Sequence, residues 1–291
     1  MKDYIVSIGT ICIDDIIVCD EWPQLGDKAL AKSKGYIVGG MPYNTACVLS
    51  NMGVKTYMLD VIGNDEYKDI IINDLTKNNV DYSLCSYDNH KTLRTIIVNV
   101  NGERVIFVIN VFNKPEIILN DEQMEVLLNA KYVYTNLPEI KRIKENKKLI
   151  KSLLSNNVKI VYDIENNSFN SVDEDEFYFK NASILSFNEK GFEKFINNKP
   201  SDYINKYLDD DIIIIITKGE NGCEVFTKEM HKKIGGHKVT PVDTTGAGDT
   251  FNATFLAEQV KGNDLISSIT KANKIAALST EHFGVNKLIG K

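Results

Sequence analysis

The chain has 291 residues, with 40 acidic and 34 basic side chains, a net charge of −6 and an isoelectric point near 5.4. This length supports one large α/β domain with a substantial core, and we expect residues 1–291 to form a single domain. An acidic balance without a basic cluster argues against binding to nucleic acid or to an anionic membrane surface.

The longest apolar runs are the length of strands, so the sequence predicts no transmembrane helix. The five cysteines are odd in number and scattered, which favours reduced core thiols over a disulfide framework. The four histidines are equally dispersed, which argues against transition-metal catalysis. The N-terminus leads directly into a strand without a cleavage site, so we expect a cytoplasmic protein.

The first predicted strands contain an acidic pair. Residues 4–8 form a hydrophobic strand pattern, and residues 11–18 continue it with Asp14 and Asp15 inside an apolar run. A carboxylate in such a strand is costly unless it faces a cleft with a polar partner or lies at a solvated edge. The local pattern allows both interpretations.

A glycine pair precedes the first predicted helix. Residues 36–38 form a short alternating strand, and Gly39 and Gly40 then permit close backbone approach before a helix over residues 46–52. Asn44 offers a polyol both a donor and an acceptor. An ordinary glycine turn at a helix start fits the same residues equally well.

The middle of the chain indicates an α/β fold. Residues 54–62 predict a strand, with a helix following to residue 78, and residues 92–99 and 103–109 flank an Asn-Gly turn that is typical of a β-hairpin. Beyond residue 121, helices and strands alternate, which predicts a parallel sheet between two helical layers. The strands are expected at 132–135, 159–163, 182–186 and 212–217, and the helices at 122–128, 143–155, 190–197 and 264–282.

The most specific motif is the string D-T-T-G-A-G-D at residues 243–249, between a strand-like run at 237–242 and an apolar helix. Gly246, Ala247 and Gly248 leave amides uncovered at a helix N-terminus, where the orphan donors and the macrodipole favour anions. Asp249 would repel a phosphate bound there, so a purely structural role explains it poorly. A base that takes a proton from an attacking hydroxyl, beside amides that stabilise a transferred phosphoryl group, explains it better. The alternative is an ordinary helix capped by Thr245 or Asp249.

This string closely resembles the C-terminal signature of the ribokinase-like (PfkB) carbohydrate kinase family, and further matches follow in order along essentially the whole chain. The resemblance implies a three-layer α/β/α sandwich with a mostly parallel central sheet. It also implies a small β-sheet lid built from about residues 12–38 and 92–110. The implied reaction transfers the γ-phosphoryl group of ATP, with Mg²⁺, to a hydroxyl of a small carbohydrate.

The resemblance also implies roles for individual residues. Asp249 is the implied catalytic base, and the amides of Gly246, Ala247 and Gly248 form the anion hole. Asp15 is then left to solvent. The implied acceptor contacts are Asp14, Gly39, Gly40, Asn44 and Arg104, and the implied ATP contacts are Asn188, Thr217, Gly219, Gly222, Thr244 and Asn273.

Two ion sites follow from the resemblance. Asp243, Thr245 and Gly284 are implied around a monovalent cation such as K⁺. The family's N-x-x-E motif, whose glutamate orders the water around Mg²⁺, begins at Asn188 but has Gly191 in place of the glutamate. Glu189 is the neighbouring carboxylate that would replace it.

Several alternatives stay open. The acceptor of a kinase with this fold is a sugar or a nucleoside, and Met41, Tyr43 or Phe107 would provide the apolar shelf that a nucleobase needs. A non-catalytic sugar- or nucleotide-binding protein on the kinase fold is a third hypothesis. A dinucleotide-dependent dehydrogenase is disfavoured, because no G-x-G-x-x-G follows the first strand. The lid strands also offer a surface for a homodimer.

Overall fold

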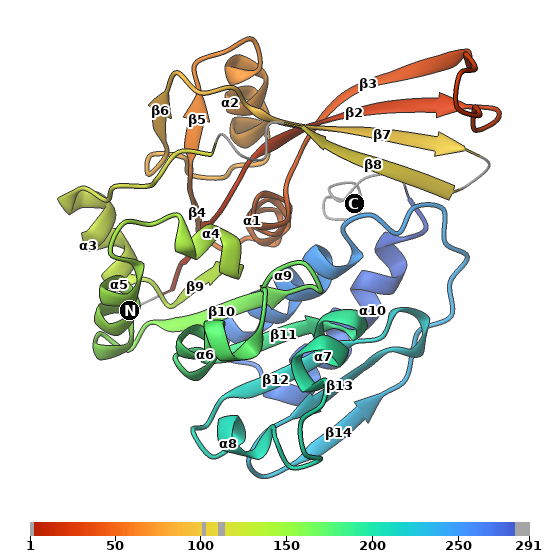
Figure 1. The fold of residues 1–291 in the computed structure, drawn as a ribbon. Coiled ribbons are helices and arrows are strands. Elements are labelled where there is room, and N and C mark those ends of the chain that lie inside the picture. The colour runs from red at the N-terminus through yellow and green to blue at the C-terminus, as the bar shows by residue number, and fades with distance from the viewer. Residues whose placement is uncertain (1–2, 101–102, 110–113, 283–291) are drawn as a thin grey trace.

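The computed structural model describes residues 3–100, 103–109 and 114–282, with the backbone alone at 103 and 104. A large sheet lies between two layers of helices, and a smaller sheet projects from one end of the molecule (Figure 1). Within the described residues, no helix is long and apolar enough to cross a membrane.

The large sheet has the strand order β14-β13-β12-β11-β10-β9-β1-β4. The strands from β12 to β4 are parallel, so their carboxyl ends lie at a common edge, whereas β13 and β14 extend the sheet in antiparallel fashion. The strand bounds are β1 Ile5–Ile8, β4 Thr56–Leu59, β9 Tyr132–Thr135, β10 Lys159–Ile164, β11 Ile184–Asn188, β12 Ile213–Thr217, β13 Cys223–Phe226 and β14 His231–Ile234.

Helices cover both faces of this sheet. On one face, α1 (Met41–Asn51), α9 (Ala247–Val260) and α10 (Leu265–Ser279) share an apolar core with the strands. The helices whose apolar residues pack on the opposite face are α3 (Asp121–Asn129), α4 (Leu137–Lys141), α5 (Asn146–Ser155), α6 (Val172–Lys180), α7 (Glu189–Ile196) and α8 (Asn205–Leu208).

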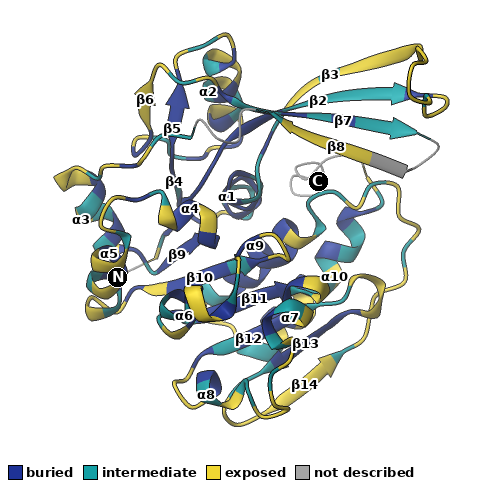
Figure 2. Cartoon of the chain, in the orientation of Figure 1, coloured by how far each residue is buried: buried dark blue, intermediate teal, exposed yellow. Residues whose placement is uncertain are grey.

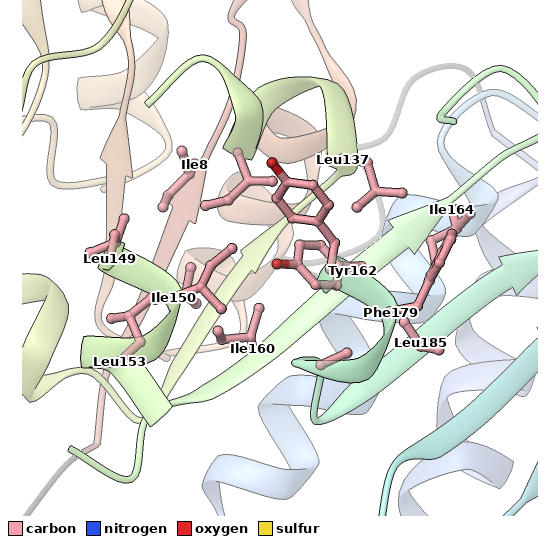
Figure 3. Packing of buried hydrophobic residues seen from close by; sticks show 14 of the residues in the cluster. Ile8, Leu137, Leu149, Ile150, Leu153, Ile160, Tyr162, Ile164, Phe179 and Leu185 are labelled. Carbon is pink, nitrogen blue, oxygen red and sulfur yellow. The ribbon is translucent and has the colours of Figure 1, made fainter. Parts of the chain in front are cut away.

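Figure 3 shows the core on this second face. Ile160, Tyr162 and Leu185 point from the sheet toward Ile150 of α5 and Phe179 of α6, and all five residues are 0% exposed. Burying an apolar side chain of this size stabilises the fold by about 1.5–3 kcal/mol. The strands therefore read as nearly continuous apolar runs, as is typical of parallel strands covered on both faces.

The smaller sheet, called the lid below, has the strand order β3-β2-β7-β8. β2 pairs in parallel with β7, and both outer pairs are antiparallel. The central strands of the large sheet are buried, whereas β3 and β8 of the lid are largely exposed (Figure 2). The lid strands are β2 Cys12–Cys19, β3 Ala31–Gly39, β7 Leu93–Val100 and β8 Glu103–Ile109.

A short helix and a two-stranded sheet lie at the base of the lid. α2 (Lys68–Lys77) packs against α1, and β5 (Val61–Gly63) pairs with β6 (Ser86–Asp88). The predicted strand over residues 54–62 is thus two strands, β4 and β5. They separate at Asp60, whose carboxylate accepts a hydrogen bond from the Ile11 amide at 2.9 Å.

Most other predicted elements are confirmed with shifts of a few residues at their ends. The strand predicted at 237–242 is wrong, because these residues are irregular and the edge strand is β14. The helix predicted from residue 143 begins at Asn146, since the Ile143 backbone is used in an isolated bridge with Ile117. The five cysteines are buried, as expected of core residues.

Candidate active site

The loop before α9 forms an open helix N-terminus. Gly246 adopts a left-handed conformation at the N-cap (φ 75°), and no side chain caps the helix. The alternative prediction, a helix capped by the side chain of Thr245 or Asp249, is therefore wrong. The Ala247 amide donates to the Thr244 carbonyl at 3.3 Å, whereas the Gly246 and Gly248 amides have no partner among the described residues. A Cβ built at Gly248 would meet no atom within 4 Å, so this side of the helix end is open to a ligand.

Asp249 lies in the first turn of α9, where α9 packs against α1. Its side chain is buried, and the Asn44 Nδ2 donates to its Oδ2 at 2.7 Å. Burial raises the pKa of Asp249 well above its usual range, and the negative charges of Asp163 and Glu165 raise it further. The structure thus brings together two residues that are 205 positions apart in the sequence.

The acceptor side of the site is built on close backbone contacts. The Thr95 hydroxyl donates to Asp14 Oδ1 at 2.6 Å, and a Cβ at Gly39 would lie 2.2 Å from the other oxygen of Asp14. Gly40 caps α1 with φ 117°, and a Cβ there would lie 2.3 Å from the Thr10 carbonyl oxygen. Both glycines are therefore required by their surroundings, and Asp14 is fixed at the base of the lid.

The second acid of the pair behaves differently from the expectation. The expectation that Asp15 faces solvent is wrong, because its side chain is 18% exposed and its Oδ2 lies 3.6 Å from Arg94 Nη2. The Arg94 guanidinium also lies over the Tyr67 ring, 5.4 Å from its centre. Because successive strand residues point to opposite faces, this cluster lies on the face of the lid away from Asp14. The backbone of Arg104 lies in β8, and its side chain is outside the described part of the structure.

The expected nucleotide contacts gather at the ends of neighbouring strands. Asn188 and Thr217 are register partners at the carboxyl ends of β11 and β12. Beyond β12, the turn Gly219–Asn221 leads to Gly222, where a Cβ would lie 2.0 Å from the Ile234 carbonyl oxygen. Asn273 of α10 donates to the Gly235 carbonyl at 2.8 Å, so α10 and this turn meet at the same short segment.

The expected cation residues lie in a loop that is tied to the end of α10. The Asp243 carboxylate accepts the Thr245 amide at 2.9 Å. The amides of Val242 and Asp243 donate to the Thr280 carbonyl at 2.6 and 2.9 Å. Thr244 is exposed between them, and Gly284 lies outside the described residues.

A buried polar network beneath Asp249 was missed from the sequence. The Tyr134 hydroxyl donates to Asp163 Oδ2 at 2.7 Å, and the Asn252 amide lies 3.4 Å from the same hydroxyl. Asn252 also accepts from Ser186 at 2.7 Å. Because Asn252 follows Asp249 by three residues, both side chains face the same side of α9. Burial raises the pKa of Asp163 to about 6. The signal in the sequence was an acid at the end of a buried strand.

A second missed carboxylate, Glu165, directly follows β10. The Asn188 side chain donates to it, and burial raises its pKa although the side chain still reaches solvent. Three carboxylates therefore lie close to one another next to the open amides of α9, namely Asp163, Glu165 and Asp249.

Comparison with known proteins gives matches over nearly the whole chain. Residues 2–289 match the family described as pfkB family carbohydrate kinase. Fructokinase-2 of Oryza sativa subsp. japonica is 26% identical, and the match covers 94% of this chain and 85% of that protein.

Solved structures show the same fold. An Arabidopsis thaliana ribokinase complexed with ribose and ATP superposes with a TM-score of 0.81, at 21% identity and 100% coverage of both chains. A Methanocaldococcus jannaschii nucleoside kinase has a TM-score of 0.82 at 22% identity, and the match covers 98% of this chain and 94% of that chain.

Proposed function

Because the chain belongs to the PfkB family of carbohydrate kinases, we propose that Asp249 activates a sugar hydroxyl for attack on the γ-phosphate of ATP. Members of this family are ATP-using phosphotransferases with an alcohol acceptor, and this chain is a sugar kinase of that family. The acceptor, the catalytic residues and the ions are the subject of the proposal.

The observation that carries the proposal is the Asn44–Asp249 hydrogen bond beside the open end of α9. Asn44 holds one carboxylate oxygen, which leaves the other for the proton of the acceptor hydroxyl. The Gly246 and Gly248 amides, with Ala247 between them, lie where a phosphoryl group in transfer needs donors. Asp14, Gly39 and Gly40 then border the acceptor, with Arg104 of β8 as a further contact.

The nucleotide is assigned to the opposite side of the same helix end. Its phosphates would follow Asn188, Thr217 and Thr244, and its adenosine part would lie along Gly219, Gly222 and Asn273. The meeting of Asn273 with Gly235 beside Gly222 supports this placement.

Mg²⁺ fits the donor set at this edge. Among the described residues, no group of three or more His, Cys, Asp or Glu side chains could hold a metal ion directly. Mg²⁺ typically keeps several waters and binds through substrate phosphates with one or two carboxylates, and Glu165 and Glu189 are the two alternative candidates next to Asn188. When bound, it would neutralise charge on the ATP phosphates.

A monovalent cation such as K⁺ is proposed beside Asp243, Thr245 and Gly284. Support comes from the two backbone bonds that join the Asp243 loop to Thr280, close in sequence to Gly284. The test compares turnover in K⁺ with turnover in tetramethylammonium at equal ionic strength.

A small sugar is the acceptor that we favour. The prediction of an apolar shelf for a nucleobase is wrong for Tyr43, because this side chain is 0% exposed and cannot contact a ligand. The strand register places Phe107 on the lid face away from Asp14. The Asp14 face instead carries Ile37 and Val108, which keeps a nucleoside as the second candidate. A panel of ribose, fructose, 2-keto-3-deoxygluconate, sugar phosphates and nucleosides with ATP distinguishes these acceptors.

The assignment of the base is tested with Asp249→Asn. We expect kcat to fall by about 10²–10⁴-fold or more, because proton transfer to a positioned base contributes that much, while ATP binding persists. Turnover close to that of the wild type would refute the role of Asp249. A variant with no ATP binding would place Asp249 in nucleotide binding instead.

We also propose a cytoplasmic location and a homodimer that forms through the lid. Tyr36, Val105 and Phe107 expose apolar surface on the lid face away from Asp14. Sedimentation equilibrium of wild type and Phe107→Lys tests the dimer, which the charged side chain should dissociate. A wild-type monomer at micromolar concentration would contradict it.

A further inference from the structure

The packing of α7 against the end of β10 explains why residue 191 is glycine. A Cβ there would lie 2.5 Å from the Ile164 carbonyl oxygen and 3.2 Å from the Glu165 carbonyl carbon. Both are backbone atoms, which cannot move aside as the end of a flexible side chain can. A glutamate at residue 191 therefore does not fit against the Ile164–Glu165 backbone of this chain.

The backbone that fills this space brings its own carboxylate. Glu165 directly follows β10, and the Asn188 side chain donates a hydrogen bond to it. Asn188 Oδ1 accepts the Gly191 amide at 2.7 Å, so the amide group of Asn188 is the part that faces Glu165. Glu165 is exposed enough for a hydrated ion to approach it.

The other carboxylates at this edge are engaged elsewhere. Asp249 is bonded to Asn44, and Asp163 accepts the Tyr134 hydroxyl. Glu189 is exposed, and the positive charge of Lys218 lies near it. Lys218 is also paired with Glu224 at 2.5 Å.

We propose that Glu165 orients the water around the Mg²⁺ of bound Mg·ATP, in the place of a glutamate at residue 191. The inference rests on the proposed kinase function and replaces Glu189 as the candidate. Outer-sphere partners of this kind typically change metal affinity by about 10- to 100-fold. Glu165 acts as a positioning residue, since it reaches the phosphates only through water.

The test is calorimetric binding of ATP to the full chain, with excess Mg²⁺ and with EDTA. The proteins compared are wild type, Glu165→Gln and the matched control Glu189→Gln. Mg²⁺ should raise the ATP affinity of the wild type, and we expect this increase to be about tenfold smaller in Glu165→Gln. The affinity for metal-free ATP should be unchanged. Glu189→Gln should keep the wild-type gain. Glutamine can still accept the Asn188 hydrogen bond, so both variants should melt at the wild-type temperature.

A wild-type Mg²⁺ gain in Glu165→Gln, or its loss in Glu189→Gln alone, would overturn the assignment and leave the kinase function intact. Absence of ATP binding in the wild type would overturn the proposed function together with this inference. Water-proton relaxation of the Mn²⁺ complex of ATP gives a second readout. Glu165→Gln should bind Mn·ATP about tenfold more weakly than Glu189→Gln does.

Discussion

At the scale of single residues, the site places two acids close together, Asp249 and Asp163. The negative charge of Asp163 disfavours the ionised form of Asp249. Asp249 and Asp163 both have raised pKa values, chiefly because they are buried. The negative charges of Asp163 and Glu165 raise the pKa of Asp249 further, and the charge of Glu165 does the same to Asp163. Hydrogen bonds oppose these shifts, from Asn44 to Asp249 and from Tyr134 to Asp163. The pair should therefore control the acidic limb of the pH profile.

The prediction concerns Asp163→Asn. A base must be ionised to accept a proton, so kcat/KM should fall as the pH falls through the raised pKa of Asp249. Removing the negative charge of Asp163 lowers that pKa, which should move the acidic limb to lower pH. The measurement is kcat/KM between pH 5 and 8.

Tyr134→Phe tests the same coupling in a second way. It removes the hydroxyl that stabilises ionised Asp163, so Asp163 carries less negative charge and the acidic limb should move to lower pH, but by less than in Asp163→Asn. An Asp163→Asn profile that superposes on the wild type would show that Asp163 only supports the fold.

At the scale of elements, the lid is joined to the body by contacts that leave no room for a side chain. Gly39, the last residue of β3, lies directly against the Asp14 carboxylate of β2. The contact between Gly39 and Asp14 thus positions both β3 of the lid and the carboxylate proposed to bind the acceptor. A change at Gly39 should act on acceptor binding more than on folding.

We expect Gly39→Ala to raise KM for the acceptor about tenfold, because the new Cβ must displace Asp14 and lose one hydrogen-bonded anchor. KM for ATP should stay within about twofold, since the nucleotide residues lie on other strands. Lys34→Ala, on the exposed part of the same strand, is the control and should leave both values unchanged. An unaltered acceptor KM in Gly39→Ala would remove Asp14 from the acceptor site.

At the scale of the whole molecule, a buried ion network joins the ends of β1 and β4 to α4. Arg142 Nη1 lies 3.0 Å from Asp60, 2.6 Å from Glu139 and 3.0 Å from the Thr10 hydroxyl. Lys114 adds a second cation, 2.6 Å from Glu139. These groups lie at the carboxyl edge of the sheet beside the root of the lid, so the network fixes the body to which the lid attaches.

Arg142→Met should lower the free energy of unfolding by about 3–5 kcal/mol at pH 8, because buried Asp60 loses its cationic partner and Glu139 keeps only Lys114. The loss should shrink at pH 5. Burial already raises the pKa of Asp60 to about 6, and removal of the cation raises it further, so protonation relieves the buried charge. Urea denaturation at both pH values measures this.

Lys148→Met is the matched control for Arg142→Met, since its partner Glu145 is exposed and surface pairs contribute at most about 1 kcal/mol. Equal losses in the two variants would contradict a structural role for the network.

The parts of the fold that follow local rules could be predicted. Buried parallel strands leave long apolar runs, and the Asn-Gly hairpin and the string before α9 have few alternative meanings, so these were predicted. The partner of Asp15 could not be, because Arg94 is brought to it by a strand about 80 residues away. Asp163 and Glu165 likewise gain their meaning only from the side-by-side order of β10 and β11 and from the proximity of α9.

Gly40 also joins the lid to the catalytic helix pair. It ends the segment that returns from the lid, begins α1, and rests on the Thr10 carbonyl of the segment that enters the lid. Both connections of the lid therefore meet at one backbone contact, and Asn44 lies in the first turn of the helix that starts there. The glycine that anchors the lid thus also sets, through Asn44, which oxygen of the Asp249 carboxylate stays open to the acceptor.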